Sequence, residues 1–264
     1  MDSILLVGCG NMGGAMLTGW LAAGADPARF TVVDPVLAEA PRGVELLREL
    51  PQRQFDAVLV GVKPQILDEV APAIAALTDS GTTVLSLLAG VELASLAARF
   101  PNAKGHVRVM PNLAVAIGKA PIALVAGGLD AIERDAVTAL MQPLGTPEWL
   151  EDEALFDLVT ALAGSGPAFV YRFIDALASG AAALGLPQDQ SERLALAMVE
   201  GAALLASASP HAPAELARRV ASPGGTTQAG LDVLDAGNAL ASVVEATLVA
   251  ARDRSTEMAR AARK

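Results

Sequence analysis

Residues 222–227, in the order Ser-Pro-Gly-Gly-Thr-Thr, are the part of this sequence best suited to binding a small anion. Pro223 and the two glycines disfavour a helix interior, whereas the two threonines can cap a helix whose apolar positions begin at Ala229. A loop of small residues that opens a helix directs several unpaired backbone N–H groups at one point, where a carboxylate or phosphate can be held. An ordinary turn is the alternative interpretation.

A second glycine-rich stretch, near the start of the chain, has the spacing of a dinucleotide-binding loop. The short apolar run 3–7 is followed by Gly8-Cys9-Gly10-Asn11-Met12-Gly13 and then by a helical pattern through about residue 22. In such a loop Gly8 permits the sharp turn, Gly10 lets the backbone approach a pyrophosphate, and Gly13 allows the helix to pack closely on the strand. The sequence therefore predicts that residues 8–13 bind a dinucleotide.

Two charged residues follow predicted strands and bear on the cofactor. Asp34 can accept hydrogen bonds from an adenine ribose 2′-hydroxyl and would repel a 2′-phosphate, which makes NADH credible. A turn residue that ends the strand before Pro35 is the alternative. Lys63 would offer a cation to cofactor phosphate or amide, although a solvated lysine is the simpler interpretation of this residue alone.

Strands and helices alternate through the first part of the chain. Strands are predicted at 3–7, 30–33, 56–62, 82–87, 105–109, 121–125 and 146–150, and helices at about 11–22, from Lys63-Pro64 onward, at 92–100 and at 130–141. This alternation predicts an α/β fold with a parallel, doubly wound sheet of the Rossmann type. Because ligands bind at the carboxyl ends of such strands, Lys63, Ala89 and Asn112 are expected at the binding edge.

Strand signals stop near residue 153, and the rest of the chain is predicted to be helical. Helices are expected at 155–162, 168–184, 187–206, 213–220, 228–235 and 238–260, with residues 164–167 (Gly-Ser-Gly-Pro) interrupting the first two. We therefore predict two domains, residues 1–152 and residues 153–264. Many apolar and small residues in few helices indicate contact with another subunit, and dense packing within one chain is the alternative.

Composition restricts the setting and the partners. The net charge of −10 and the lack of a basic run before the last few residues argue against nucleic acid and anionic membranes. The single cysteine, Cys9, precludes an internal disulfide and indicates a reducing compartment. We expect a cytoplasmic protein with no signal peptide, no transmembrane helix, because Asp, Gly or Pro breaks every long apolar stretch, and no metal site.

Few side chains of the helical part are suited to acid–base work. It has no lysine before Lys264, and its one histidine, His211, lies beside Pro210 in an expected loop. Reduction of a ketone needs a proton donor at the carbonyl oxygen, usually Lys or His, whereas an imine nitrogen can arrive already protonated. The composition thus favours reduction of a C=N bond, although Lys63 or His106 could supply a donor to a C=O bond.

The sequence resembles the pyrroline-5-carboxylate reductase family, whose members make proline by reducing a cyclic imine with NAD(P)H. The resemblance runs from end to end of the chain. It rests on residues 8–13, Val62-Lys63-Pro64-Gln65, Ala89-Gly90-Val91, Met110-Pro111-Asn112, residues 163–168 (Ala-Gly-Ser-Gly-Pro-Ala) and residues 222–227.

The resemblance implies a nucleotide domain followed by a helical domain for substrate binding and dimerisation, with higher oligomers allowed. It implies that the backbone of residues 222–227 holds the substrate carboxylate and that Thr227 is the catalytic hydroxyl beside the ring nitrogen. The substrate residues are then Glu153, Ser222, Gly224, Gly225, Thr226 and Thr227, and the cofactor residues are Gly8, Gly10, Asn11, Met12, Gly13, Asp34, Val62, Lys63, Pro64 and Ala89.

Two departures from the family pattern and two rival functions stay open. Asp34 stands where members often carry a neutral residue, so the family implies NADPH while Asp34 admits NADH, and Leu113-Ala114 replaces a common Thr-Pro. A dehydrogenase of small hydroxy acids would need a helix-borne lysine after residue 164, and a non-catalytic NAD(P)-binding regulator would not need the 222–227 loop. Oligomer size, feedback by proline and the breadth of imine substrates are not predicted.

Overall fold

The computed structural model describes residues 1–262, and Arg263 and Lys264 lie outside the described residues. The chain forms two compact units: Met1–Ser165 with the residues from Ala250 onward make the first, and Gly166–Val249 make the second. The sequence predicts two domains with a boundary after residue 152. These compact units do not test whether those domains fold separately, so the boundary stays a prediction.

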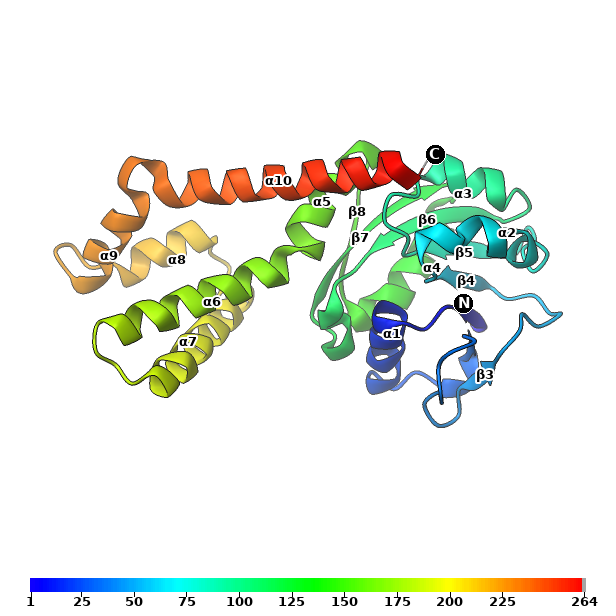
Figure 1. Ribbon diagram of the computed structural model, residues 1–264, viewed down its shortest axis with the longest axis horizontal. Coiled ribbons are helices and arrows are strands. Elements are labelled where there is room, and N and C mark those ends of the chain that lie inside the picture. The colour runs from blue at the N-terminus through cyan, green and yellow to red at the C-terminus, as the bar shows by residue number, and fades with distance from the viewer. Residues whose placement is uncertain (263–264) are drawn as a thin grey trace. The chain divides into compact units, whose positions relative to one another are not determined.

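The first unit is built on an eight-stranded sheet in the order β3-β2-β1-β4-β5-β6-β7-β8 (Figure 1). The strands are β1 (Ile4–Val7), β2 (Phe30–Val33), β3 (Glu45–Leu47), β4 (Ala57–Val60), β5 (Thr83–Ser86), β6 (Gly105–Met110), β7 (Ala120–Gly127) and β8 (Gly145–Trp149). The inner strands β1 and β4 are wholly apolar and buried, as a parallel sheet covered on both faces requires. Strand order reverses between β1 and β4, which is where such sheets bind ligands.

Two features of this sheet differ from the prediction. β7 pairs antiparallel with β6, so the sheet is not wholly parallel. The connection between them holds only the 3-10 turn Leu113–Ile117, which is too short for the crossover that a parallel pair needs. The edge strand β3 is absent from the prediction because its three residues, Glu-Leu-Leu, are too few to show an alternating pattern.

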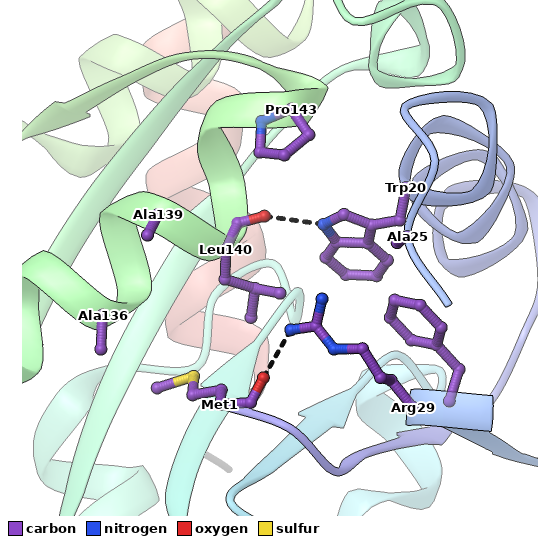
Figure 2. A pocket seen from close by; sticks show the side chains of 9 residues that line it. Met1, Trp20, Ala25, Arg29, Ala136, Ala139, Leu140 and Pro143 are labelled. Atoms are coloured by element: carbon purple, nitrogen blue, oxygen red, sulfur yellow. Dashed lines mark hydrogen bonds between the residues drawn. The ribbon is translucent and has the colours of Figure 1, made fainter. Parts of the chain in front are cut away.

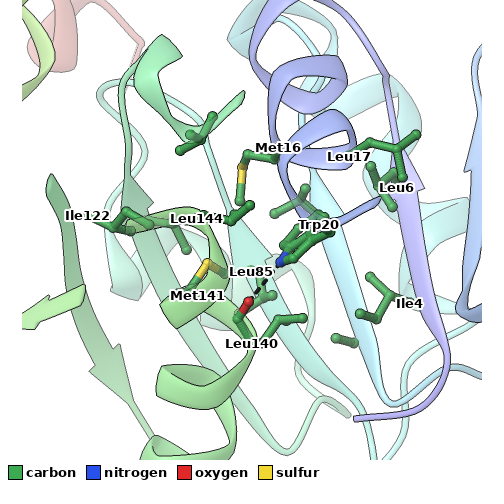
Figure 3. Close-up of a cluster of buried hydrophobic side chains, with 14 of the residues drawn as sticks. Ile4, Leu6, Met16, Leu17, Trp20, Leu85, Ile122, Leu140, Met141 and Leu144 are labelled. Carbon is green, nitrogen blue, oxygen red and sulfur yellow. Dashed lines mark hydrogen bonds between the residues drawn. The ribbon is translucent and has the colours of Figure 1, made fainter. Parts of the chain in front are cut away.

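Helices cover both faces of the sheet. On one face, α1 (Asn11–Ala22) and α4 (Ala131–Met141) pack on the strands, and on the other face α2 (Leu67–Ala75) and α3 (Leu93–Arg99) do so. Figure 3 shows the first of these cores, where Trp20 of α1 points toward α4 and its indole N–H donates to the carbonyl of Leu140 at 2.7 Å. The buried indole nitrogen is therefore paired, as a polar atom in a core should be.

Gly19 marks the closest approach of α1 to the turn before β7. A Cβ at Gly19 would lie 2.1 Å from the carbonyl oxygen of Val115 and 2.7 Å from Leu144 Cδ2. We expect Gly19→Ala to lower the free energy of unfolding in urea by about 3 kcal/mol, because the helix must move away. The control is Gly14→Ala on the same helix, whose Cβ would meet only ordinary contacts, 3.6 Å from the Cys9 carbonyl oxygen. Equal losses in the two variants would contradict this explanation.

The second unit is helical. It comprises α6 (Gly166–Ala183), α7 (Gln188–Ala208), α8 (Pro213–Val220), α9 (Thr226–Asp235) and α10 (Ala239–Ala262) as far as Val249. α5 (Phe156–Val159) precedes it in the first unit. Among the described residues of the second unit only Ala178, Ser191 and Ala195 are buried. Large apolar side chains, such as Tyr171, Leu205 and Val233, are exposed instead, so this unit does not form a dense core of its own.

Two helical stretches, Glu153–Ala183 and Thr226–Arg260, are long and apolar enough to cross a membrane by length and composition alone, and the bent pair Gln188–Ala208 with Pro213–Val220 would add a third. The breaks noted in the sequence therefore do not by themselves exclude a spanning helix, and the expectation of no transmembrane helix stays a prediction. The helix continues through residues 160–164 as a π-helical turn, and α9 joins α10 through one 3-10 turn, Ala236–Asn238. Gly164 thus does not end the first stretch, whereas Gly237, with a φ of +58°, marks a kink between α9 and α10.

Candidate functional site

The glycine loop after β1 adopts the sharp turn that its sequence predicts. Gly8 has a φ of +87°, and a Cβ there would lie 2.9 Å from the carbonyl oxygen of Gly61. The loops after β1 and β4 thus touch backbone to backbone, and Gly61 is as necessary to this contact as Gly8. Sequence reasoning missed Gly61, although its place just before Val62-Lys63-Pro64 is visible in the sequence.

The open side of this loop is shaped for a phosphate group. A Cβ added at Gly10 would meet no atom within 4 Å, whereas one at Gly13 would lie 2.9 Å from the Gly8 carbonyl oxygen. Gly10 is the N-cap of α1, and no side chain caps the helix there. The first-turn N–H groups, including those of Asn11 and Met12, therefore face a space that an anion can enter. These residues fit the pyrophosphate of a dinucleotide.

Asp34 is bonded to the glycine loop rather than free. Its Oδ2 accepts a hydrogen bond from the Cys9 N–H at 2.9 Å, and its Oδ1 accepts from the N–H groups of Val36 and Leu37. Burial alone would raise the pKa of this carboxyl, but the three N–H groups and the nearby Arg48 guanidinium hold the pKa below its usual value. Asp34 is thus a buried anion that ties the end of β2 to the loop, and it serves as a turn residue as well.

The remaining candidate cofactor residues follow β4 and β5 at the same edge of the sheet. Lys63 is exposed and precedes the 3-10 turn Pro64–Ile66, which leads into α2, so proline does begin this helical segment as predicted. Val62 and Ala89 are half-buried. Asn112 follows β6, and both polar atoms of its side chain are hydrogen-bonded within the protein. Nδ2 donates to the Ala163 carbonyl, and Oδ1 accepts from the Ala114 N–H.

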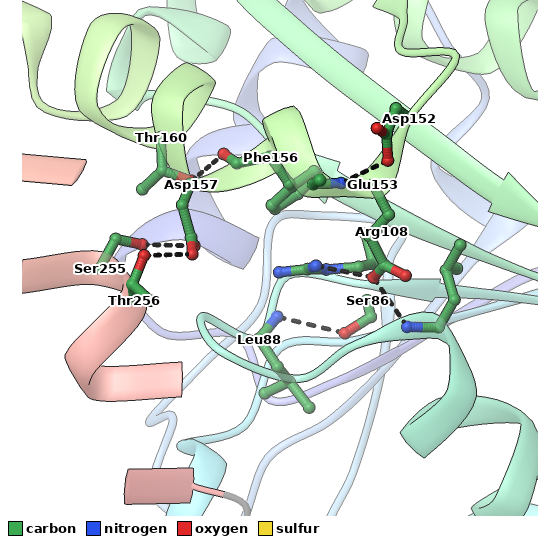
Figure 4. A network of polar contacts seen from close by, with 12 residues as sticks. Ser86, Leu88, Arg108, Asp152, Glu153, Phe156, Asp157, Thr160, Ser255 and Thr256 are labelled. Atoms are coloured by element: carbon green, nitrogen blue, oxygen red, sulfur yellow. Dashed lines mark hydrogen bonds and ion pairs between the residues drawn. The ribbon is translucent and has the colours of Figure 1, made fainter. Parts of the chain in front are cut away.

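Glu153 lies in a polar network beside the loop after β5 (Figure 4). Its Oε1 pairs with Arg108 at 2.7 Å and accepts the backbone N–H of Leu93 at 2.9 Å. The Arg108 guanidinium is buried, stacks 3.8 Å above the ring of Phe156, and its Nε has no partner among the described residues. Sequence reasoning missed Arg108, whose place inside an apolar strand was the available signal. The buried Arg108 guanidinium is thus the ion-pair partner of Glu153.

The anion loop of residues 222–227 lies in the second unit and opens α9. Gly224 has a φ of +71°, and the Gly225 N–H donates to the Ser222 carbonyl at 2.9 Å. The expectation that the threonines cap the helix is wrong, because Gly225 is the N-cap and makes no side-chain capping bond. Thr226 and Thr227 instead occupy the exposed first turn. Their N–H groups and hydroxyls both remain available to a ligand.

A cavity of about 160 Å³ lies at the amino edge of the sheet, away from all predicted site residues (Figure 2). Its walls include Trp20, Phe30, Arg29 and Met1, and Arg29 donates to the Met1 carbonyl at 2.5 Å. Across residues 1–262, no group of three or more His, Cys, Asp or Glu side chains is placed to hold a metal ion. The carboxyl edge of the sheet and the 222–227 loop therefore remain the candidate sites.

Comparison with known proteins bears on both candidate sites. The family model for pyrroline-5-carboxylate reductase dimerisation matches residues 153–258, and that for NADP oxidoreductase, coenzyme F420-dependent, matches residues 3–90. The pyrroline-5-carboxylate reductase of Pseudomonas aeruginosa is 33% identical over 97% of this chain and 96% of its own length. This chain belongs to the pyrroline-5-carboxylate reductase family. The enzyme of that name from Aquifex aeolicus is 43% identical over 68% of this chain and 67% of its own.

Similarity to solved structures of the pyrroline-5-carboxylate reductase family extends over the whole chain. The enzyme from Coxiella burnetii is 29% identical, covers 97% of this chain and 98% of its own, and superposes with a TM-score of 0.89. The fold predicted from the sequence, a Rossmann-type sheet followed by a helical dimerisation region, is confirmed by this match and by the family models. The protein is an oxidoreductase, and the family model that matches its helical region is the one for dimerisation.

Proposed function

We propose that the protein reduces the C=N bond of 1-pyrroline-5-carboxylate to give proline, with NADPH or NADH as the reductant. The observation that carries the proposal is the uncapped N-terminus of α9, with two hydroxyls on its first turn, in a chain that also has the open Gly10 loop. The test measures reduction of the imine with NADPH and with NADH. In parallel, it measures oxidation of a 3-hydroxyisobutyrate-like acid with the two oxidised cofactors. Turnover of the hydroxy acid alone, or cofactor binding without imine turnover, would contradict the proposal.

The first unit would bind the cofactor along the carboxyl edge of its sheet. The α1 N-terminus would hold the pyrophosphate at Gly10, with Val62, Lys63, Pro64 and Ala89 placed along the same edge. When bound, the reduced nicotinamide supplies the hydride for the imine carbon. Pro64 fixes the start of the segment after Lys63, because its ring sets φ there.

The second unit would bind the substrate through the 222–227 loop. The N–H groups at the start of α9 would hold the carboxylate, and the Thr227 hydroxyl would orient the ring nitrogen, with Thr226 beside it. Because the imine arrives protonated, no strong acid is needed. Positioning supplies the acceleration, and holding two reactants in near-attack geometry can contribute about 7–11 kcal/mol.

Glu153 would lie near the bound amino acid. Arg108 and the Leu93 N–H both engage Oε1, which leaves Oε2 as the oxygen for a positively charged nitrogen. The ion pair with Arg108 fixes the position of this carboxyl group. This supports the assignment of Glu153 as a substrate residue.

The assembly would be a cytoplasmic homodimer, allowing a higher oligomer. The second unit buries almost none of its apolar side chains, and the dimerisation family model covers this same region. We therefore propose that a second copy of the chain, and not a membrane, buries the exposed apolar side chains of these helices. Sedimentation of the purified protein should give a dimer or larger species without detergent, and a stable monomer or a requirement for detergent would contradict this.

Asp34 provides a test of cofactor choice. Asp34→Asn removes the negative charge near a 2′-phosphate and keeps an oxygen for the turn at Val36, so the ratio of kcat/KM for NADPH to that for NADH should rise about tenfold. Asp26→Asn is the matched control, since that carboxylate also caps a turn, at Ala28 before β2. An unchanged ratio in the Asp34 variant would show that this carboxylate serves only to tie the loop.

A further inference from the structure

The C-terminal part of α10 lies directly on the loop that follows β5. Gly90 in this loop has a φ of +76°, and a Cβ there would be 2.8 Å from Cα and 3.2 Å from the backbone N of Ala259. Ala259 is 6% exposed, and Leu88 and Val91, which flank the turn, are buried too. The loop that carries Ala89 therefore packs directly against the backbone of α10. All of these residues belong to the first unit.

One carboxylate is hydrogen-bonded to two side chains of this part of α10. Asp157 of α5 accepts a hydrogen bond from Ser255 Oγ through Oδ1 and another from Thr256 Oγ1 through Oδ2, each at 2.8 Å (Figure 4). All three side chains are half-buried, so water competes only in part for these bonds. Ser255 and Ala259 are four residues apart in one helix and so lie on the same side of it. Asp157 is thus hydrogen-bonded to the side of α10 that contacts Gly90.

The same short segment also holds the far end of the loop. Glu153, which lies four residues before Asp157, accepts the Leu93 N–H at the start of α3 and pairs with Arg108. The loop between β5 and α3 is therefore fixed at Leu93 through Glu153 and at Gly90 through α10 and Asp157. Motion of Asp157 or α10 would be passed to Ala89, which directly precedes Gly90 in this loop.

We propose that Asp157 is a positioning residue for the nicotinamide cofactor, acting through Ser255, Thr256 and the α10 backbone on the Ala89–Gly90 turn. The inference rests on the proposed function in one respect, since the contact between Ala89 and the cofactor is itself proposed. Hydrogen bonds to a carboxylate are stronger than those between neutral groups, so removing both frees the helix end measurably. The effect falls on cofactor binding, because the 222–227 loop belongs to the other unit.

The test compares cofactor and substrate constants in variants of the whole protein. Asp157→Ala, and separately the double variant Ser255→Ala with Thr256→Val, should each raise the dissociation constants of NADPH and NADH about tenfold, as followed by the fluorescence of reduced nicotinamide. The KM for the imine should stay within about twofold of its original value. Thr256→Ser keeps a hydroxyl and should bind cofactor normally. Thr247→Val on the same helix is the matched control, because that hydroxyl donates within the helix to the Val243 carbonyl.

Each outcome decides the proposal. A merely structural Asp157 would reduce the folded fraction and kcat while the folded remainder kept its cofactor affinity, so unchanged dissociation constants overturn the inference. Equal rises in the constants for cofactor and imine overturn it as well. If the unaltered protein binds cofactor but does not reduce the imine, the proposed function fails, and the cofactor titration still decides the role of Asp157. If the unaltered protein binds neither NADPH nor NADH, the proposed function and the role of Asp157 are both contradicted.

Discussion

Gly10→Ala should raise the dissociation constants of both NADPH and NADH about 100-fold, or about 2.8 kcal/mol at 1.4 kcal/mol per tenfold. The structure makes this variant informative because an added Cβ at Gly10 would meet no protein atom within 4 Å. The methyl group would instead occupy the space in front of the α1 N-terminus, where the backbone must approach the pyrophosphate. The loss should therefore appear in binding, whereas the fold should be unaffected.

The measurement is a fluorescence titration of each reduced cofactor, accompanied by thermal unfolding without cofactor. Gly14→Ala is the control, since its Cβ would lie 3.6 Å from the Cys9 carbonyl oxygen on the same helix, in ordinary contact. It should bind both cofactors normally. Gly8→Ala serves as the contrast, because φ of +87° and the 2.9 Å approach to Gly61 predict a loss of stability as well as of binding. Normal cofactor binding by Gly10→Ala would mean that the dinucleotide lies elsewhere.

Local patterns in the sequence account for the elements that were predicted well. β2 is found at residues 30–33 and α8 at residues 213–220, both as predicted, since a short apolar run and a proline at the first helical position are signals carried by the elements themselves. The glycine loop was predictable for the same reason. Its shape depends on which residues tolerate a sharp turn, and this is a property of residues 8–13 alone.

Pairings between distant residues were beyond such patterns. The direction of β7 depends on its connection to β6 rather than on its own residues, so an antiparallel pair was missed within an otherwise parallel sheet. Arg108 and Glu153 pair across 45 residues, and Asp157 meets Thr256 across 99. No spacing rule links such residues. The sequence could name Glu153 through the family resemblance, but not the cation that pairs with it.

The two roles left open for Asp34 show where the structure adds to the sequence. A carboxylate at the end of β2 suits a ribose or a turn, and the sequence has no means of choosing. The structure supplies three N–H donors to that carboxylate, one of them from the glycine loop. Asp34 thus does act as a turn residue, because its Oδ1 accepts from the N–H groups of Val36 and Leu37. A ribose contact would use the remaining acceptor capacity of Oδ2, and this is the contact that the Asp34→Asn comparison tests.

Thr227→Ala should lower kcat for the imine about 100-fold, the usual scale for removing one well-placed polar group at a reacting centre. The substrate KM should change by about threefold or less, because the backbone N–H groups that hold the carboxylate are kept in the variant. Cofactor binding should not change, since the glycine loop belongs to the other compact unit. Thr227 is exposed and makes no capping bond at α9, so stability should change by less than about 0.5 kcal/mol.

The neighbouring threonine provides the internal control for this experiment. Thr226→Ala removes the same hydroxyl one position earlier on the α9 turn, where the side chain points in another direction around the helix, and it should cost less than about fivefold in kcat. Thr227→Ser keeps the hydroxyl and should retain most of the activity. An unaltered kcat in Thr227→Ala, or equal losses in the two alanine variants, would mean that the turn only holds the carboxylate and that the ring nitrogen is oriented by another group. Glu153, with its free Oε2, would then be the next residue to replace.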